Sequence, residues 1–123
     1  MLKFLTPLRP TLYAVLRIVA GLLFAAHGFQ KLFGALGYPA PVPMFSLLWF
    51  AGVIEAVAGF GIAVGFYASP LALLASGQMA VAYFQAHLPR GPWPIMNGGE
   101  LALLYCFLFL YIAANGSGKW SVR

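Results

Sequence analysis

The sequence predicts an all-α integral membrane protein, a four-helix bundle with up-down topology that forms one domain over residues 1–123. Hydrophobic residues make up 63% of the chain and charged residues only 7%, whereas about a quarter of the residues in a soluble domain are charged. Four apolar segments approach the roughly 20 residues that a membrane-spanning helix needs. Connections rich in proline and glycine separate these segments, and both residues end helices.

The expected spans follow one another along the chain. They cover residues 11–33, 44–66, 71–88 and 99–114, and the last two are near the short limit. The first could be read as a signal peptide, because Lys3 and Arg9 precede it. However, Arg17 interrupts its apolar core and three more apolar segments follow, so we interpret it as a retained helix.

The basic residues predict the orientation of these spans. Five of them fall on the side of the chain termini: Lys3, Arg9, Arg17, Lys119 and Arg123. Lys31 and Arg90 fall on the opposite side. Because cytoplasmic segments carry the excess of Lys and Arg, both termini are expected in the cytoplasm. The lipid bilayer is then the first partner of this chain.

Charge and cysteine content exclude two classes of function. The net charge is +5, but the basic residues form neither a cluster nor a helical face, so nucleic-acid binding is not expected. The one cysteine, Cys106, cannot form a disulfide within the chain or act as a dithiol relay.

Ionisable residues inside the spans are the first candidates for a functional role, because each costs about 2.5–3.5 kcal/mol to place in a membrane. At 100° per residue, one stripe of the first helix contains Arg17, Gly21, Phe24, Gly28 and Lys31, with His27 beside it. Glycines on this stripe predict that it packs against another helix. Arg17 and Lys31 could also extend to opposite membrane interfaces.

Glu55 lies near the middle of the second span, with Gly52 and Gly59 on its own face. A buried carboxylate needs a partner or becomes protonated. Arg17 and His27 are at similar depths, and the longer side chain favours a pair between Arg17 and Glu55. Such a pair could fix the helix register, or Glu55 could handle protons or bind a ligand.

The topology brings a second set of polar residues to the outer end of the bundle: His27, Lys31, His87, Arg90, Asn97 and Glu100. This convergence predicts a polar pocket at the outer face. Helix capping alone could account for His87, Asn97 and Glu100. The spacing of the histidines and Glu100 is not that of a metal motif, so no metal is expected.

Three stretches of the sequence resemble the DoxX family of small membrane proteins: LRIVAGLLFAAHGFQKLFG (16–34), GVIEAVAGFGIAVGF (52–66) and NGGELALLYCFLFLYIAANGSGKWSV (97–122). The resemblance implies a multi-pass protein of the bacterial cytoplasmic (inner) membrane. It also implies a link to a subunit of thiosulfate:quinone oxidoreductase and to thiol and oxidative-stress systems. It would assign function to six residues: Arg17, His27, Lys31, Glu55, Asn97 and Glu100.

Three functions remain open from the sequence. The chain could be an accessory subunit that packs against other membrane subunits or copies of itself. It could be a quinone-linked oxidoreductase component, with quinone as the one cofactor considered and an anion-attracting pocket. It could be a small proton-coupled transporter that uses Arg17 and Glu55. Because no flavin, haem or iron–sulfur motif is recognisable, catalysis by this chain alone is not expected.

Overall fold

The computed structural model describes residues 2–122, and within that range it contains helices and no strand. The α-helices are α1 (Arg9–Phe33), α2 (Leu47–Val64), α3 (Ala68–Ala82), α4 (Pro94–Asn97) and α5 (Glu100–Asn115). A 3-10 turn over Thr6–Leu8 precedes α1. α3 continues into a π-helical turn over Tyr83–His87 and a 3-10 turn over Leu88–Arg90. The all-α prediction is confirmed.

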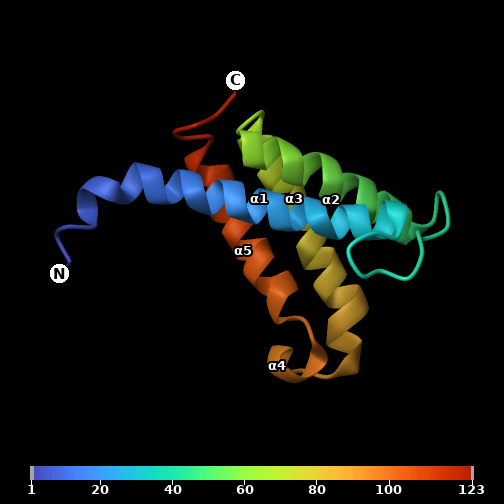
Figure 1. The fold of residues 1–123 in the computed structure, drawn as a ribbon. Helices are drawn as coiled ribbons and strands as arrows, with labels where there is room; N and C mark the ends of the chain where they lie inside the picture. Colours follow the sequence, from blue (N-terminus) through green and yellow to red (C-terminus); the bar gives the residue numbers. More distant parts are fainter. Residues whose placement is uncertain (1, 123) are drawn as a thin grey trace.

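The long helices form two antiparallel pairs (Figure 1). α1 and α2 make the first hairpin, and α3 and α5, joined by the segment that contains α4, make the second hairpin. The second hairpin crosses the first steeply, and its far end, with α4, extends away from α1 and α2 (Figure 1). This crossing leaves a wedge between the hairpins, and the candidate site lies there.

Two helices are long and apolar enough to span a membrane by length and composition. They cover Thr6–Phe33, with 28 residues, and Leu47–Val64, with 18 residues. The helix over Glu100–Asn115 is apolar but shorter. Two of the four expected spans therefore meet this criterion.

The boundaries of the helices differ from the expected ones where a capping residue or a proline decides them. α2 begins at Leu47 because Ser46 is extended and its side chain accepts a hydrogen bond from the Trp49 N–H. α3 begins at Ala68, so Pro70 lies inside its first turn. The expected start at residue 71 was wrong, because the first four N–H groups of a helix need no partner within it and tolerate proline.

α1 and α2 approach each other closely through glycines. A Cβ atom added to Gly21 would lie 2.5 Å from the carbonyl oxygen of Gly59. One added to Gly28 would lie 2.6 Å from the carbonyl oxygen of Gly52. No side chain fits at such distances, so both contacts require glycine. The predicted packing role of the glycine stripe is confirmed.

Three aromatic rings join the two hairpins at the narrow part of the wedge. The Phe24 ring of α1 lies 4.8 Å from that of Phe109 and 5.4 Å from that of Tyr105, both on α5, between ring centroids. Tyr105 and Phe109 stack with centroids 5.2 Å apart. All three residues are buried. Such rings contribute large buried apolar areas and favourable quadrupole contacts.

Arg17 is completely buried and holds the C-terminal segment against the first hairpin. It donates hydrogen bonds to backbone carbonyls at the end of α2 and beyond α5: Ile62, Ala63, Ser117, Lys119 and Trp120. The last carbonyls of a helix have no partner within it. Arg17 therefore satisfies the end of α2 and fastens the C-terminal segment to it.

Candidate functional site

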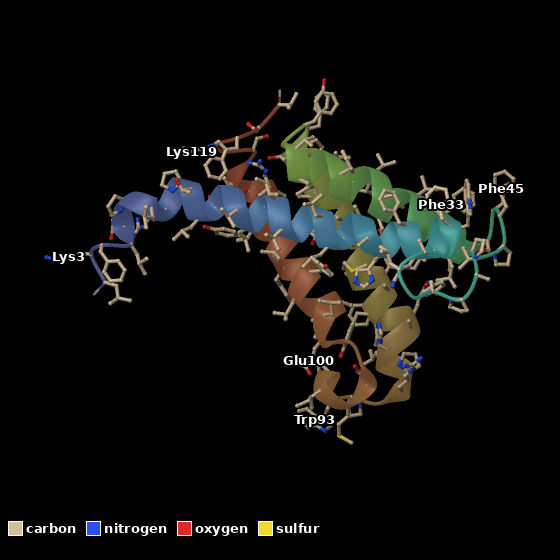
Figure 2. All side chains as sticks on the ribbon, viewed as in Figure 1. Lys3, Phe33, Phe45, Trp93, Glu100 and Lys119 are labelled. Carbon is tan, nitrogen blue, oxygen red and sulfur yellow. The ribbon has the colours of Figure 1, made fainter. Side chains whose placement is uncertain are left out.

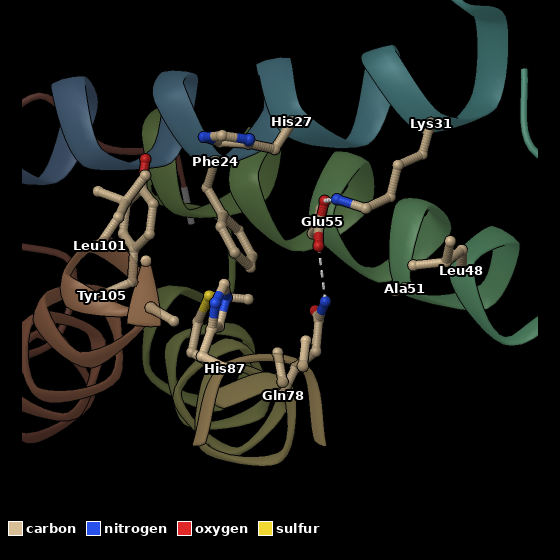
Figure 3. Close-up of a pocket in the computed structure, with 15 residues that line it drawn as sticks. Phe24, His27, Lys31, Leu48, Ala51, Glu55, Gln78, His87, Leu101 and Tyr105 are labelled. Carbon is tan, nitrogen blue, oxygen red and sulfur yellow. Dashed lines mark hydrogen bonds and ion pairs between the residues drawn. The ribbon is translucent and has the colours of Figure 1, made fainter. Parts of the chain in front are cut away.

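A cavity of about 330 Å³ lies between the two hairpins (Figure 3). Residues from α1, α2, α3 with its π-helical turn, and α5 line it. Its polar lining side chains are His27, Lys31, Glu55, Gln78, His87 and Tyr105. Apolar side chains, among them Phe24, Leu48 and Leu101, form the rest of the wall. Concave, mainly apolar sites with a few convergent polar groups are typical of small-molecule binding.

Glu55 is the centre of a hydrogen-bonded chain across three helices. The Lys31 Nζ lies 2.8 Å from Glu55 Oε1, and the Gln78 Nε2 donates to Glu55 Oε2 at 2.7 Å (Figure 3). The Lys31 side chain is only 19% exposed and that of Glu55 4%. The opposite charges therefore compensate each other in a largely desolvated place, where a single charge would be costly.

The expected pair between Arg17 and Glu55 is wrong. The ion pair of Glu55 is with Lys31, and Arg17 donates only to backbone carbonyls. The reason is the register of the first hairpin: Lys31 lies beside Gly52, one turn before Glu55, whereas Arg17 lies at the other end of α2. Lys31 is thus not free to extend into water, as its place near the end of α1 had suggested.

His87 reaches the cavity from the π-helical turn that follows α3. Its Nδ1 lies 3.3 Å from the backbone oxygen of Asn97. A π-helical turn contains an extra residue, and such turns are frequent at functional sites. Figure 3 shows the His87 ring below Phe24, in the space between Tyr105 and Gln78.

Asn97 fastens the loop between the π-helical turn and α5. It is 1% exposed. Its Nδ2 donates to the Tyr83 hydroxyl at 3.2 Å and to the Gly91 carbonyl at 2.9 Å, and its Oδ1 accepts from the Gly99 N–H at 2.8 Å. These partners use both donors and the oxygen of the Asn97 side chain, so its role here is to position the loop.

The structure brings three of the six outer candidates to the cavity: His27, Lys31 and His87. Arg90 and Glu100 are exposed and lie outside its lining. Arg90 lies beside the cavity residue Gly98, since a Cβ on Gly98 would be 3.9 Å from an Arg90 guanidinium nitrogen. Glu100 occupies the first turn of α5, where an acidic side chain complements the helix dipole.

Sequence analysis missed Gln78 and Tyr105 as site residues. Gln78 did carry a signal, since it is an amide in the middle of the apolar run LLASGQMAVA. Polar side chains inside a membrane helix usually face other protein groups. Tyr105 carried none, because a tyrosine in an apolar helix can equally anchor the chain at a membrane interface.

Within residues 2–122, no three His, Cys, Asp or Glu side chains are grouped so that they could hold a metal ion. The groups that the cavity does offer are hydrogen-bonding groups: two imidazoles, an ammonium–carboxylate pair, an amide and a phenol. They can bind and orient a small polar ring, and imidazole and carboxylate can exchange protons with it.

Comparison with known proteins agrees with these features. An uncharacterized protein of Haemophilus influenzae is 40% identical over an alignment of 123 positions, which covers 89% of this chain and 87% of the relative. No solved structure matches the chain significantly. The DoxX family model matches residues 12–88, which include most of α1, all of α2 and α3, and every cavity residue from Phe24 to His87. The resemblance found in the sequence is thereby confirmed, and this chain belongs to the DoxX family of membrane proteins.

Proposed function

We propose that this protein is a quinone-binding membrane subunit of a larger redox complex. The cavity between the hairpins carries the proposal, because it gathers polar side chains from all four long helices inside an otherwise apolar structure. Its volume of about 330 Å³ is at the lower end of ligand pockets. That size suits a ring-shaped head group, with an apolar tail extending toward lipid.

The chemistry of the lining fits such a ring. Phe24 and Tyr105 offer aromatic walls, and His27 and Lys31 can donate hydrogen bonds to ring oxygens. A bound quinone would supply two-electron, two-proton chemistry, with the electrons exchanged with a partner subunit. Glu55 is the one carboxyl group of the lining, and its contacts with Lys31 and Gln78 join three walls of the cavity.

The proposal includes an arrangement in the membrane. All four long helices cross the bacterial cytoplasmic membrane as two hairpins, with both termini in the cytoplasm. In support, Lys3, Arg9 and Lys119 are exposed near the termini, whereas Arg90 is the exposed basic residue of the described part of the chain at the other end. The segments carrying Phe45 and Trp93 lie away from Lys3 and Lys119 (Figure 2).

Single-cysteine labelling in intact cells tests this arrangement. In a Cys106→Ser background, an impermeant thiol reagent should label Trp93→Cys, whose side chain is 65% exposed. Lys3→Cys should be labelled only after the cells are opened. Equal labelling of both in intact cells would contradict the proposed orientation.

Native mass spectrometry with lipid extraction tests quinone binding. Ala51 lines the cavity, so Ala51→Phe should fill part of it and remove co-purifying quinone. Leu104→Phe is the matched control, because Leu104 is 67% exposed and outside the lining. The wild type and the control should retain quinone. Partner proteins at fixed stoichiometry without any quinone would instead indicate a purely structural subunit.

The proton-coupled transporter is the weaker alternative. The transporter hypothesis required a pair between Arg17 and Glu55. However, Arg17 donates to backbone carbonyls, and the charge of Glu55 is compensated by Lys31. The structural-subunit reading keeps its support in the exposed apolar helix faces, although lipid covers such faces equally well.

A further inference from the structure

Resting on the proposed function, we infer that the cavity binds the hydroquinone form of its ligand in preference to the quinone, because its α3 wall presents fixed hydrogen-bond acceptors. The α3 wall is the lining from α3 and its π-helical turn, and its polar side chains are His87 and Gln78. In each, the donor end is already used by another group of the protein. The acceptor end is the one left for a ligand.

The hydrogen bond of His87 fixes which of its nitrogens carries the proton. Its Nδ1 lies 3.3 Å from the backbone oxygen of Asn97, and a carbonyl oxygen can only accept. The proton of the neutral ring is therefore on Nδ1, and Nε2 keeps a lone pair. His87 lines the cavity, and its Nε2 makes no hydrogen bond with another residue in the range 2–122, so this nitrogen remains to accept one from a ligand.

The amide of Gln78 is fixed in the same way by Glu55. A carboxylate accepts hydrogen bonds, so the amide nitrogen of Gln78 must face it, as the distance of 2.7 Å between Nε2 and Glu55 Oε2 shows. Oε1 of Gln78 then points elsewhere. It is buried and accepts no hydrogen bond from any residue in the described part of the chain. A hydroxyl placed beside it would supply the missing donor.

The opposite wall is adaptable. The hydroxyl of Tyr105 and the imidazole of His27 can each donate or accept, and neither makes a hydrogen bond with another residue in the range 2–122. Their rings lie 6.2 Å apart between centroids and edge to face. This wall can serve a carbonyl or a hydroxyl, so it does not discriminate between the two redox forms.

The α3 wall decides the preference, because the opposite wall and Lys31 can serve both redox forms: an ammonium donates to a carbonyl oxygen and to a hydroxyl oxygen alike. A hydroquinone hydroxyl can donate a hydrogen bond to the acceptors of the α3 wall. A quinone carbonyl has no proton to donate, so its lone pairs would face the lone pairs of these acceptors and repel them. Leaving a buried acceptor unsatisfied is costly, and we expect the hydroquinone to bind about tenfold more tightly. A tenfold preference makes the potential of the bound couple about 30 mV more positive than that of the free couple.

The test is calorimetric titration of the protein in lipid nanodiscs, without oxygen, with decylubiquinol and with decylubiquinone. A mildly alkaline buffer keeps free imidazole neutral. The measured quantity is the ratio of the two dissociation constants. In His87→Gln the new amide can turn to donate or to accept, so the ratio should fall toward one while binding persists. Glu100→Gln, exposed and outside the cavity lining, is the control and should keep the wild-type ratio.

The outcomes separate the inference from the function on which it rests. If neither form binds, the proposed function is wrong and the inference is overturned with it. If both bind with equal affinity, or the quinone binds more tightly, the function stands and the inference is wrong. An unchanged ratio in His87→Gln would overturn the role of His87. Should that variant not fold, Gln78→Met removes the second acceptor and must also lower the ratio.

Discussion

Replacing Arg17 by methionine is expected to detach the C-terminal segment and to destabilise the whole protein. Methionine retains an unbranched apolar stem but loses every donor of the guanidinium group. In the native protein these donors satisfy carbonyls of α2 and of the segment after α5. Arg17 is 0% exposed, so water cannot enter and replace it without movement of the chain.

The magnitude follows from which carbonyls stay buried in the variant. The hydrogen bonds to Ile62 at 3.0 Å and to Ala63 at 3.3 Å are buried. The Ile62 carbonyl keeps a second donor, the Gly65 N–H at 3.1 Å, so it loses one hydrogen bond of about 0.5–1.5 kcal/mol, whereas an unsatisfied Ala63 carbonyl costs about 1–3 kcal/mol. The C-terminal carbonyls, such as that of Trp120, can reach water once the segment moves away, so they add little. We therefore expect a loss of about 3 kcal/mol in the free energy of unfolding, the middle of the summed range.

Two assays check this expectation. The midpoint of thermal unfolding in a mild detergent, followed by circular dichroism, should fall by on the order of 10 °C. Digestion by carboxypeptidase should become faster at the C-terminus. Arg17→Lys keeps the charge but has a single nitrogen, so it should be intermediate in both assays. If Arg17→Met unfolds at the wild-type temperature with its C-terminus still protected, the role derived for Arg17 is wrong.

Three further perturbations address the packing, the ion pair and a helix cap. Gly21→Val should lower the free energy of unfolding by at least about 3 kcal/mol, because its Cβ would meet backbone atoms at 2.5 Å. Gly77→Ala is the control and should be tolerated, because a Cβ at Gly77 has nothing within 4 Å. Equal midpoints of thermal unfolding for the two variants would contradict this. Lys31→Met should cost about 3–5 kcal/mol by leaving a buried carboxylate unpaired, and adding Glu55→Gln should restore most of that loss in the same assay. A double variant no more stable than the single one would argue against the pair. Ser46→Ala should lower the free energy of unfolding by about 1 kcal/mol, because α2 loses its N-terminal cap. The midpoint of thermal unfolding should then fall slightly, and an unchanged midpoint would show that the cap contributes nothing.

Sequence reasoning succeeded where a local pattern determines the structure. The apolar runs predicted the long helices, and the angular position of Gly21 and Gly28 predicted the face on which α1 packs. The predicted start of α3 was too late because Pro70 suggested a helix end, whereas a proline can equally lie in the first turn of a helix. These are properties of neighbouring residues, which a sequence displays directly.

The partner of Glu55 could not be predicted in the same way. On straight helices Arg17 and His27 lie at similar depths relative to Glu55, and the longer side chain made Arg17 the expected partner. The register of the first hairpin brings Lys31 to Glu55, and carbonyls of the C-terminal segment, about 100 residues away from Arg17 in the sequence, take the Arg17 guanidinium. The cavity depends likewise on how steeply the two hairpins cross (Figure 1), which no local periodicity encodes.

The ion pair between α1 and α2 also bears on how the chain is made. α1 leaves the ribosome first, carrying the charge of Lys31, and the compensating Glu55 follows only 24 residues later on α2. Entering lipid alone, α1 would expose an uncompensated ammonium to hydrocarbon. The cheaper route is for both helices to enter the bilayer together, already paired through their glycines. The first hairpin is then the unit of biogenesis, and its Lys31–Glu55 pair is already formed when the second hairpin packs against it.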